Sequence, residues 1–247
     1  MIVEQAARAG QQKDSLCGPF HAACVLLDAG VGEWEGIPVD QDLVALHAGT
    51  TVPPGPEVPP GAASLRDYRY ELPVVDAERA GTSPAGLADA IALLSAGRLD
   101  CVPLRGGWRA EAVERLVDAA PALGARLIAN LRTGRLWGSR PPVEALLAEL
   151  AGEPADAVPV AEWDVGHFVE LVTVARGRGG ALLVVGDSYP SFGWMGHHLQ
   201  PPRAIAAALL RGDGRAGGVL AVVRSGGAAR VGDMADELGL DTRLWEN

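Results

Sequence analysis

Residues 166–187 read GHFVELVTVARGRGGALLVVGD and contain the two strongest strand signals of the chain. Residues 166–174 and 181–187 are mostly apolar and rich in valine and leucine, and the segment between them is rich in glycine. This pattern predicts two antiparallel strands joined as a hairpin. Because the start of the first strand then lies beside the end of the second, His167 and Asp187 are expected at the same end of the sheet.

The rest of the C-terminal half continues this mixture of strands and helices. Short apolar runs at 125–131 and 218–223 predict two further strands, and helical patterns cover 143–151 and 202–210. Antiparallel strands that pack against helices are typical of the α+β class. We therefore expect an α+β domain built on an antiparallel sheet.

The N-terminal region predicts a helix that begins at a cysteine. Residues 17–19 read Cys-Gly-Pro, and an apolar run follows that ends near Gly30. Proline is favoured in the first helical turn because its missing N–H would have no partner there. Cys17 is therefore expected at the N-terminus of a helix packed against the sheet. A short second helix is predicted over residues 40–47.

The middle of the chain looks helical and poor in sheet. A proline-rich surface loop is predicted over residues 52–61. Two helices are predicted after it, over residues 85–96 and 110–119, with a strand-like run at residues 99–104 between them. We expect residues 1–247 to form a single domain, with a helical insertion over roughly 50–124 and a C-terminal tail over 228–247.

Composition limits the classes of function. The chain is 48% hydrophobic and 21% charged, as is typical of a globular protein, and its net charge of −10 argues against a nucleic-acid partner. Cys17, Cys24 and Cys101 fit neither a disulfide framework nor a CxxC metal site. No signal peptide or membrane span is predicted. We expect a cytoplasmic protein with free thiols and no membrane contact.

Three separated residues have the chemistry of a nucleophilic site. A cysteine attacks a carbonyl as thiolate, and both a helix N-terminus and a neighbouring imidazolium lower the pKa of a thiol. Cys17 has the first of these features, and His167 is a candidate for the second. Asp187 is expected to hold the imidazole in the tautomer that accepts the thiol proton. Cys24 and Cys101 are expected in the core.

Three segments resemble a known family: residues 11–19 (QQKDSLCGP), 166–169 (GHFV) and 184–190 (VVGDSYP). They resemble the papain-like cysteine peptidases, especially the subgroup that contains the bacteriocin-processing (double-glycine leader) peptidases and the phytochelatin synthases. The resemblance implies a papain-like α+β fold with a catalytic triad, and no cofactor or metal.

The resemblance also implies a glutamine that stabilises the oxyanion formed during acyl transfer. The usual position of this glutamine, six residues before the cysteine, corresponds to Gln11, and the neighbouring Gln12 is an alternative. The backbone N–H of Cys17 would be the second donor. Removing one such donor typically lowers the rate by about 10²–10³.

These features predict a cysteine-dependent enzyme that acts on an amide or a thioester of a peptide or small acyl donor. Water as the acceptor makes the protein a peptidase or amidase, which is the outcome we expect. An amine acceptor makes it an acyltransferase or ligase.

Two alternatives come from other classes of protein. The chain is a non-catalytic binding module if Cys17 is an unreactive thiol on the same scaffold. It is a metalloprotein if Cys17 and His21, four residues apart on one helix face, bind metal together with His197 and His198.

Overall fold

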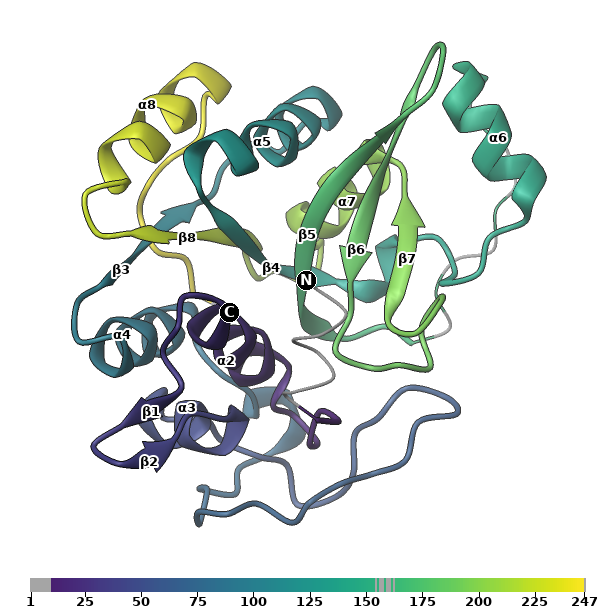
Figure 1. The fold of residues 1–247 in the computed structure, drawn as a ribbon. Helices are drawn as coiled ribbons and strands as arrows, with labels where there is room; N and C mark the ends of the chain where they lie inside the picture. Colours follow the sequence, from purple (N-terminus) through teal and green to yellow (C-terminus); the bar gives the residue numbers. More distant parts are fainter. Residues whose placement is uncertain (1–9, 154, 156–157, 159–160, 162, 247) are drawn as a thin grey trace.

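The computed structural model describes residues 10–153, 155, 158, 161 and 163–246 (Figure 1). Its centre is a six-stranded sheet with the strand order β3-β8-β4-β5-β6-β7, in which each neighbouring pair is antiparallel. The strands are β3 (Leu99–Leu104), β4 (Arg126–Arg132), β5 (Gly166–Arg176), β6 (Ala181–Gly186), β7 (His197–Gln200) and β8 (Gly218–Arg224). The fold is therefore α+β.

Helices cover both faces of the sheet (Figure 1). The helices on one face are α5 (Ala110–Leu123), α7 (Pro202–Leu210) and α8 (Ala228–Leu238). The other face carries α2 (Cys17–Asp28) and α4 (Pro84–Leu94), with α3 (Gln41–His47) packed on both. The smaller elements are β1 (Glu33–Trp34), β2 (Ile37–Pro38), η1 (Ala77–Arg79), η2 (Thr133–Arg135) and α6 (Val143–Ala151), which contacts β6.

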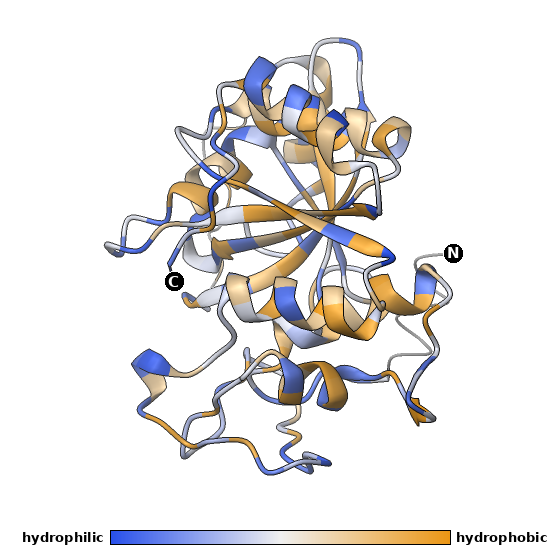
Figure 2. Ribbon diagram, turned by 90° about the vertical axis from the view of Figure 1, so that its left-hand side faces the viewer, coloured by the Kyte–Doolittle hydropathy of each residue, from blue (hydrophilic) through white to orange (hydrophobic). Residues whose placement is uncertain are grey.

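The two helical layers correspond to two apolar cores. Along β4, Leu127, Ala129 and Leu131 pack with α5, α7 and α8, whereas Ile128 packs with α2 and α4. Successive side chains of a strand point to opposite faces, so a strand covered on both sides is apolar throughout. Figure 2 shows this hydrophobic colouring on strands that lie between helices.

The predicted hairpin is confirmed. Strands β5 and β6 pair from Glu170 opposite Gly186 to Arg176 opposite Ala181, with a register shift between Leu171 and Thr173. The other helices and strands predicted from periodicity are also present, with ends that differ by a few residues. Strand β7 and the small β1–β2 pair have no counterpart in the sequence prediction.

The helical insertion predicted over roughly 50–124 is wrong for its second half. Strand β3 pairs with β8 along its whole length, from Leu99 opposite Arg224 to Leu104 opposite Val219. Helix α5 contributes fully buried side chains, such as Leu116, to the main core. The partner of β3 lies more than a hundred residues away, so no local pattern could reveal that this segment is an edge of the sheet.

The predicted C-terminal tail is also part of the fold. In α8, Val231 and Ala235 are fully buried in the main core. Trp245 is 3% exposed, and a Cβ added to Gly218 would lie 2.6 Å from its ring. The last segment therefore packs against β8 and is part of the core.

The approach of α2 to β5 positions the site. A Cβ added to Gly18 would lie 3.1 Å from the ring of Phe168, so the absence of a side chain permits this close contact. The N-terminus of α2 thereby lies at the start of β5. No helix in the described part of the chain has the length and apolar character needed to cross a membrane.

Candidate active site

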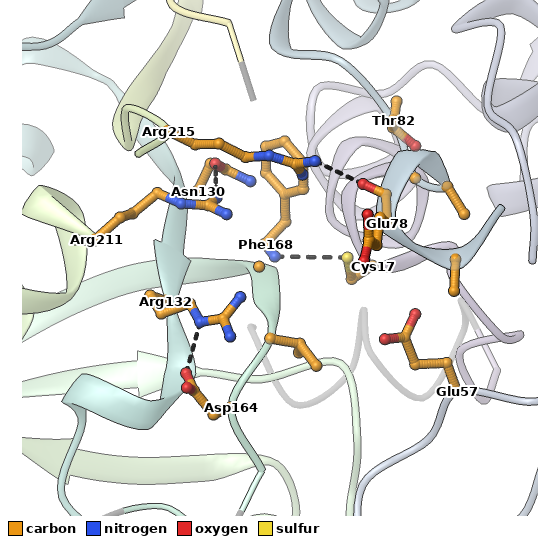
Figure 3. A pocket seen from close by; sticks show the side chains of 15 residues that line it. Cys17, Glu57, Glu78, Thr82, Asn130, Arg132, Asp164, Phe168, Arg211 and Arg215 are labelled. Carbon is orange, nitrogen blue, oxygen red and sulfur yellow. Dashed lines mark hydrogen bonds and ion pairs between the residues drawn. The ribbon is translucent and has the colours of Figure 1, made fainter. Parts of the chain in front are cut away.

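Cys17 is the first residue of α2, as predicted. The first backbone N–H groups of a helix have no acceptor within the helix and carry a partial positive charge. The N-cap residue is Leu16, whose side chain offers no oxygen to these groups. The Cys17 sulfur accepts a hydrogen bond from the backbone N–H of Phe168, at 3.5 Å (Figure 3). Cys17 thus lies between the helix N-terminus and the start of β5.

The strand register brings His167 and Asp187 together. Gly186, the last residue of β6, lies opposite Glu170, so the chain that leaves β6 runs beside the start of β5. Nε2 of His167 lies 3.2 Å from Oδ1 of Asp187, and the backbone N–H of Tyr189 donates to the same oxygen at 2.9 Å. Both charged side chains are almost fully buried, at 1% and 3% exposure.

These contacts determine the charge of the imidazole. Burial by itself lowers the pKa of His167, but the charge and hydrogen bond of the Asp187 carboxylate, together with the nearby Cys17 sulfur, raise this pKa to about 10. Burial raises the pKa of Asp187, yet the charge and hydrogen bond of His167 hold it below its ordinary value. The contacts therefore favour an imidazolium between a carboxylate and a sulfur.

A second imidazole faces the other oxygen of Asp187. Nε2 of His198, on β7, lies 3.9 Å from Oδ2 of Asp187. The side-chain amide of Gln200 donates to Nδ1 of His198 at 3.0 Å, so the proton of the neutral ring is on Nε2. Gln200 is itself held by the backbone of Trp137, at 2.8 and 3.0 Å. Burial lowers the pKa of His198 to about 4, which keeps this ring neutral.

The structure brings Gln12 to the site and leaves Gln11 outside it. Gln11 is exposed, and its amide donates to the carbonyl of Ala63. Gln12 is 1% exposed, lines a narrow cavity with Cys17, and donates to the hydroxyl of Tyr189 at 2.8 Å. The assignment of the site glutamine is corrected from Gln11 to Gln12. The chain bends at residue 11, and the side chains of these two adjacent residues point in different directions, so a difference of one position decides burial.

Aromatic side chains cover the His167–Asp187 pair. The ring of Trp163 lies 5.2 Å from that of His167 and 5.7 Å from that of Tyr189, measured between centroids. Phe192 adds contacts to Trp163 and to His198. These rings exclude water from the carboxylate, which strengthens its interaction with both imidazoles.

Cys17 opens into a cavity of about 290 Å³ with charged walls (Figure 3). Arg132, Arg211 and Arg215 line one side, and Glu57 and Glu78 line the other. This cavity is large enough to accept several heavy atoms of a ligand beside the sulfur.

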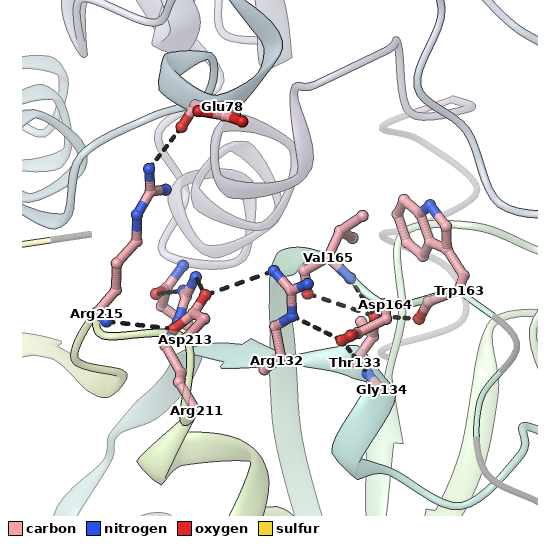
Figure 4. Close-up of polar contacts among 11 residues, drawn as sticks. Glu78, Arg132, Thr133, Gly134, Trp163, Asp164, Val165, Arg211, Asp213 and Arg215 are labelled. Atoms are coloured by element: carbon pink, nitrogen blue, oxygen red, sulfur yellow. Dashed lines mark hydrogen bonds and ion pairs between the residues drawn. The ribbon is translucent and has the colours of Figure 1, made fainter.

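Two of these arginines are held in place by carboxylates and the third by a backbone carbonyl (Figure 4). Arg132 donates to Asp164 at 2.6 Å, and the buried Arg211 donates through two nitrogens to Asp213, at 3.1 and 2.8 Å. Arg215 reaches across to the carbonyl of Glu78 at 2.6 Å. Polar groups therefore flank the approach to Cys17 on both sides.

The remaining expectations concern metals and the other thiols. No group of three or more potential ligands among the described residues is arranged to hold a metal ion, so the cluster of Cys17, His21, His197 and His198 does not form. His21 is buried, and its burial lowers its pKa to about 3. Cys24 is buried and Cys101 is partly buried against the apolar core, and burial raises the pKa of both thiols to about 12.

The fold and site define an α+β protein in which a thiol at a helix N-terminus shares a cavity with a histidine that is paired with a buried aspartate. The chain belongs to the family of unknown function DUF6885, whose sequence profile matches residues 1–246. Neither a curated protein nor a solved structure matches it. Functional conclusions therefore rest on the geometry of this site.

Proposed function

We propose that the protein is a cysteine-dependent acyl-transfer enzyme with a papain-like arrangement of helix and sheet. One observation carries this proposal: Cys17, His167 and Asp187 come from separate elements, and the Cys17 sulfur lies at the start of β5 beside the hydrogen-bonded His167–Asp187 pair. Such an arrangement of nucleophile, base and orienting acid is the recurring signature of nucleophilic catalysis.

In the proposed reaction, the Cys17 sulfur attacks the carbonyl carbon of an amide or thioester and forms a C–S bond. The imidazolium of His167 gives its proton to the leaving group as the original C–N or C–S bond breaks. A thioester between substrate and Cys17 results. The now neutral His167 takes a proton from water as the water oxygen attacks this thioester, and the C–S bond breaks, which releases the acid product and restores the Cys17 thiolate. An amine in place of water yields a new amide.

Asp187 acts in this scheme by keeping the imidazole charged and oriented. Its Oδ1 contacts Nε2 of His167, which leaves Nδ1 for the sulfur. The backbone N–H groups at the start of α2 are available to the oxyanion, and Gln12 lies on the same side of the cavity. We propose hydrolysis of a peptide or a small amide as the first activity to examine.

Alkylation by iodoacetamide tests the nucleophile. At pH 7 we expect modification at Cys17 alone, because the raised pKa values of Cys24 and Cys101 keep these thiols protonated. In H167N the imidazolium is lost, and we expect the alkylation rate at pH 7 to fall about tenfold or more. Peptide mapping by mass spectrometry identifies the modified residue.

The controls separate an enzyme from a binding module. C17S removes the thiol that we expect to react, so it must abolish the rapid alkylation expected of the wild-type protein. Equal and slow modification of all three thiols, unaffected by H167N, would identify an unreactive scaffold and contradict the proposed function.

A further inference from the structure

Ser15 has an unusual backbone conformation two residues before the nucleophile. Its φ is 61°, in the left-handed region that favours glycine. A serine held there costs free energy that a glycine would avoid. Such outliers concentrate at functional sites, where the surrounding structure holds them in place.

The hydroxyl oxygen of Ser15 is also buried without a partner. Within the described part of the chain, this oxygen neither donates nor accepts a hydrogen bond. Buried polar groups are nearly always paired, so an unpaired hydroxyl requires an explanation. A ligand oxygen in the adjacent cavity is one group that would pair with it.

Ser15 lies beside the position where the oxyanion of the proposed reaction would form. Ser15 lines the same narrow cavity, of about 60 Å³, as Cys17, Gln12 and His167. The N-terminus of α2 lies two residues away, and its partial positive charge favours an anion at this position.

Gln12 is already engaged by other partners. Its side-chain nitrogen donates to the Tyr189 hydroxyl at 2.8 Å and to the carbonyl of Lys13 at 3.1 Å. Its oxygen accepts from Ser188. An amide nitrogen has two N–H groups, so both are used. Ser15 therefore adds an unpaired side-chain donor to the residues that line this cavity.

We propose that the Ser15 hydroxyl donates a hydrogen bond to the oxyanion formed when Cys17 attacks a carbonyl. As the C–S bond forms, the π electrons of the carbonyl move to oxygen, and this oxygen accepts from the Ser15 O–H and the Cys17 backbone N–H. Ser15 keeps its proton throughout, and the donors release the oxygen when the carbonyl re-forms. This role rests on the proposed function and adds a catalytic residue to it.

Two reactions of the same thiol distinguish this role from a structural one. Acylation by p-nitrophenyl acetate passes through an oxyanion, whereas alkylation by iodoacetamide displaces iodide and forms none. For S15A and S15G we expect acylation of Cys17 to slow by about 10–100-fold and alkylation to stay within about twofold of wild type. Glycine adopts this backbone conformation without strain, so we expect S15G to fold at least as well as wild type. S225A, at an exposed serine, is the matched control.

Each outcome decides the assignment. Unchanged acylation in S15A and S15G overturns it. An equal loss of acylation and alkylation also overturns it, since the residue then serves only to position Cys17. A wild-type Cys17 that reacts with neither reagent contradicts the proposed function itself.

Discussion

The buried carboxylate of Asp187 lies between two imidazoles that carry different charges. His167 has a carboxylate and a sulfur as partners, and its pKa is raised to about 10. His198 receives a hydrogen bond at Nδ1 from Gln200, and burial lowers its pKa to about 4. One ring is therefore an ion-pair partner of Asp187, and the other is a neutral donor that faces the same carboxylate.

Replacement of His198 tests whether this neutral donor matters. H198N removes Nε2, and we expect the Asp187 carboxylate to be less well stabilised, so that the pKa of His167 moves down from about 10. H198Q keeps a nitrogen near the position of Nε2 and should restore this pKa. NMR titration of the histidine ring protons measures the pKa directly.

The adjacent residue provides the control for this prediction. His197 lies beside His198 on β7, and H197N should leave the pKa of His167 unchanged. If H198N behaves like H197N, the second imidazole has no part in the site.

Single residues also mark the limit of sequence reasoning. Cys17, His167 and Asp187 were predictable because a helix start and a hairpin each have a local pattern. The choice between Gln11 and Gln12 depended on which side chain faces inward. His198 and Ser15 gave no usable signal, since one needs the pairing of β7 and the other needs a backbone angle.

Among the elements, the contact between α2 and β5 determines where the sulfur lies. Gly18 lies close to Phe168: a Cβ added to Gly18 would be 3.1 Å from the Phe168 ring. A side chain at this position must displace either the helix or the ring, and Cys17 is the neighbouring residue.

We expect G18A to lower the alkylation rate of Cys17 about tenfold, because α2 moves away from β5 and the sulfur from His167. F168L should partly rescue G18A by making room for the methyl group. G232A in α8 is the matched control: no atom lies within 4 Å of its added Cβ, and it should leave the rate unchanged. A G18A rate equal to that of wild type would contradict the importance of this contact.

The C-terminal segment is a second element with a testable role. Trp245 is 3% exposed and packs at β8, so W245A should lower the free energy of unfolding by roughly 3 kcal/mol. Leu244 is 43% exposed, and L244A should have little effect. Urea denaturation measures both. Equal stability of W245A and wild type would restore the interpretation of residues 228–247 as a tail.

At the scale of the whole molecule, histidines set the pH dependence of stability. His21 and His198 have pKa values lowered to about 3 and 4. Between these values and pH 6.5, both rings stay neutral in the folded protein, whereas the same histidines in the unfolded chain bind protons. The contribution of these two histidines to the free energy of unfolding is complete above pH 6.5 and is lost as the pH falls toward 4. The raised pKa of His167 acts in the other direction, and its contribution is lost between pH 6.5 and about 10.

We therefore expect maximal stability near pH 6.5. Thermal denaturation from pH 4 to pH 9 measures this profile, and H198Q should reduce the loss on the acid side. A melting temperature that is constant between pH 6.5 and 4.5 would contradict the buried, neutral state of these two rings.

The α+β class and the central hairpin of the molecule were predictable from periodicity alone. The order of the six strands was not, because β3 and β8 meet only after more than a hundred intervening residues. The charged cavity beside Cys17 combines residues of β4, β5 and η1 with a loop at residue 57 and the loop after α7, and no single segment contains its pattern.

The most direct test of the central proposal is detection of an acyl-enzyme. Wild-type protein treated with p-nitrophenyl acetate should carry one acetyl group on Cys17, seen by mass spectrometry after rapid quenching, and H167N should acylate about 100-fold more slowly. Acetylation that is absent from Cys17, or equally fast in H167N, would contradict a Cys17–His167 pair that performs acyl transfer.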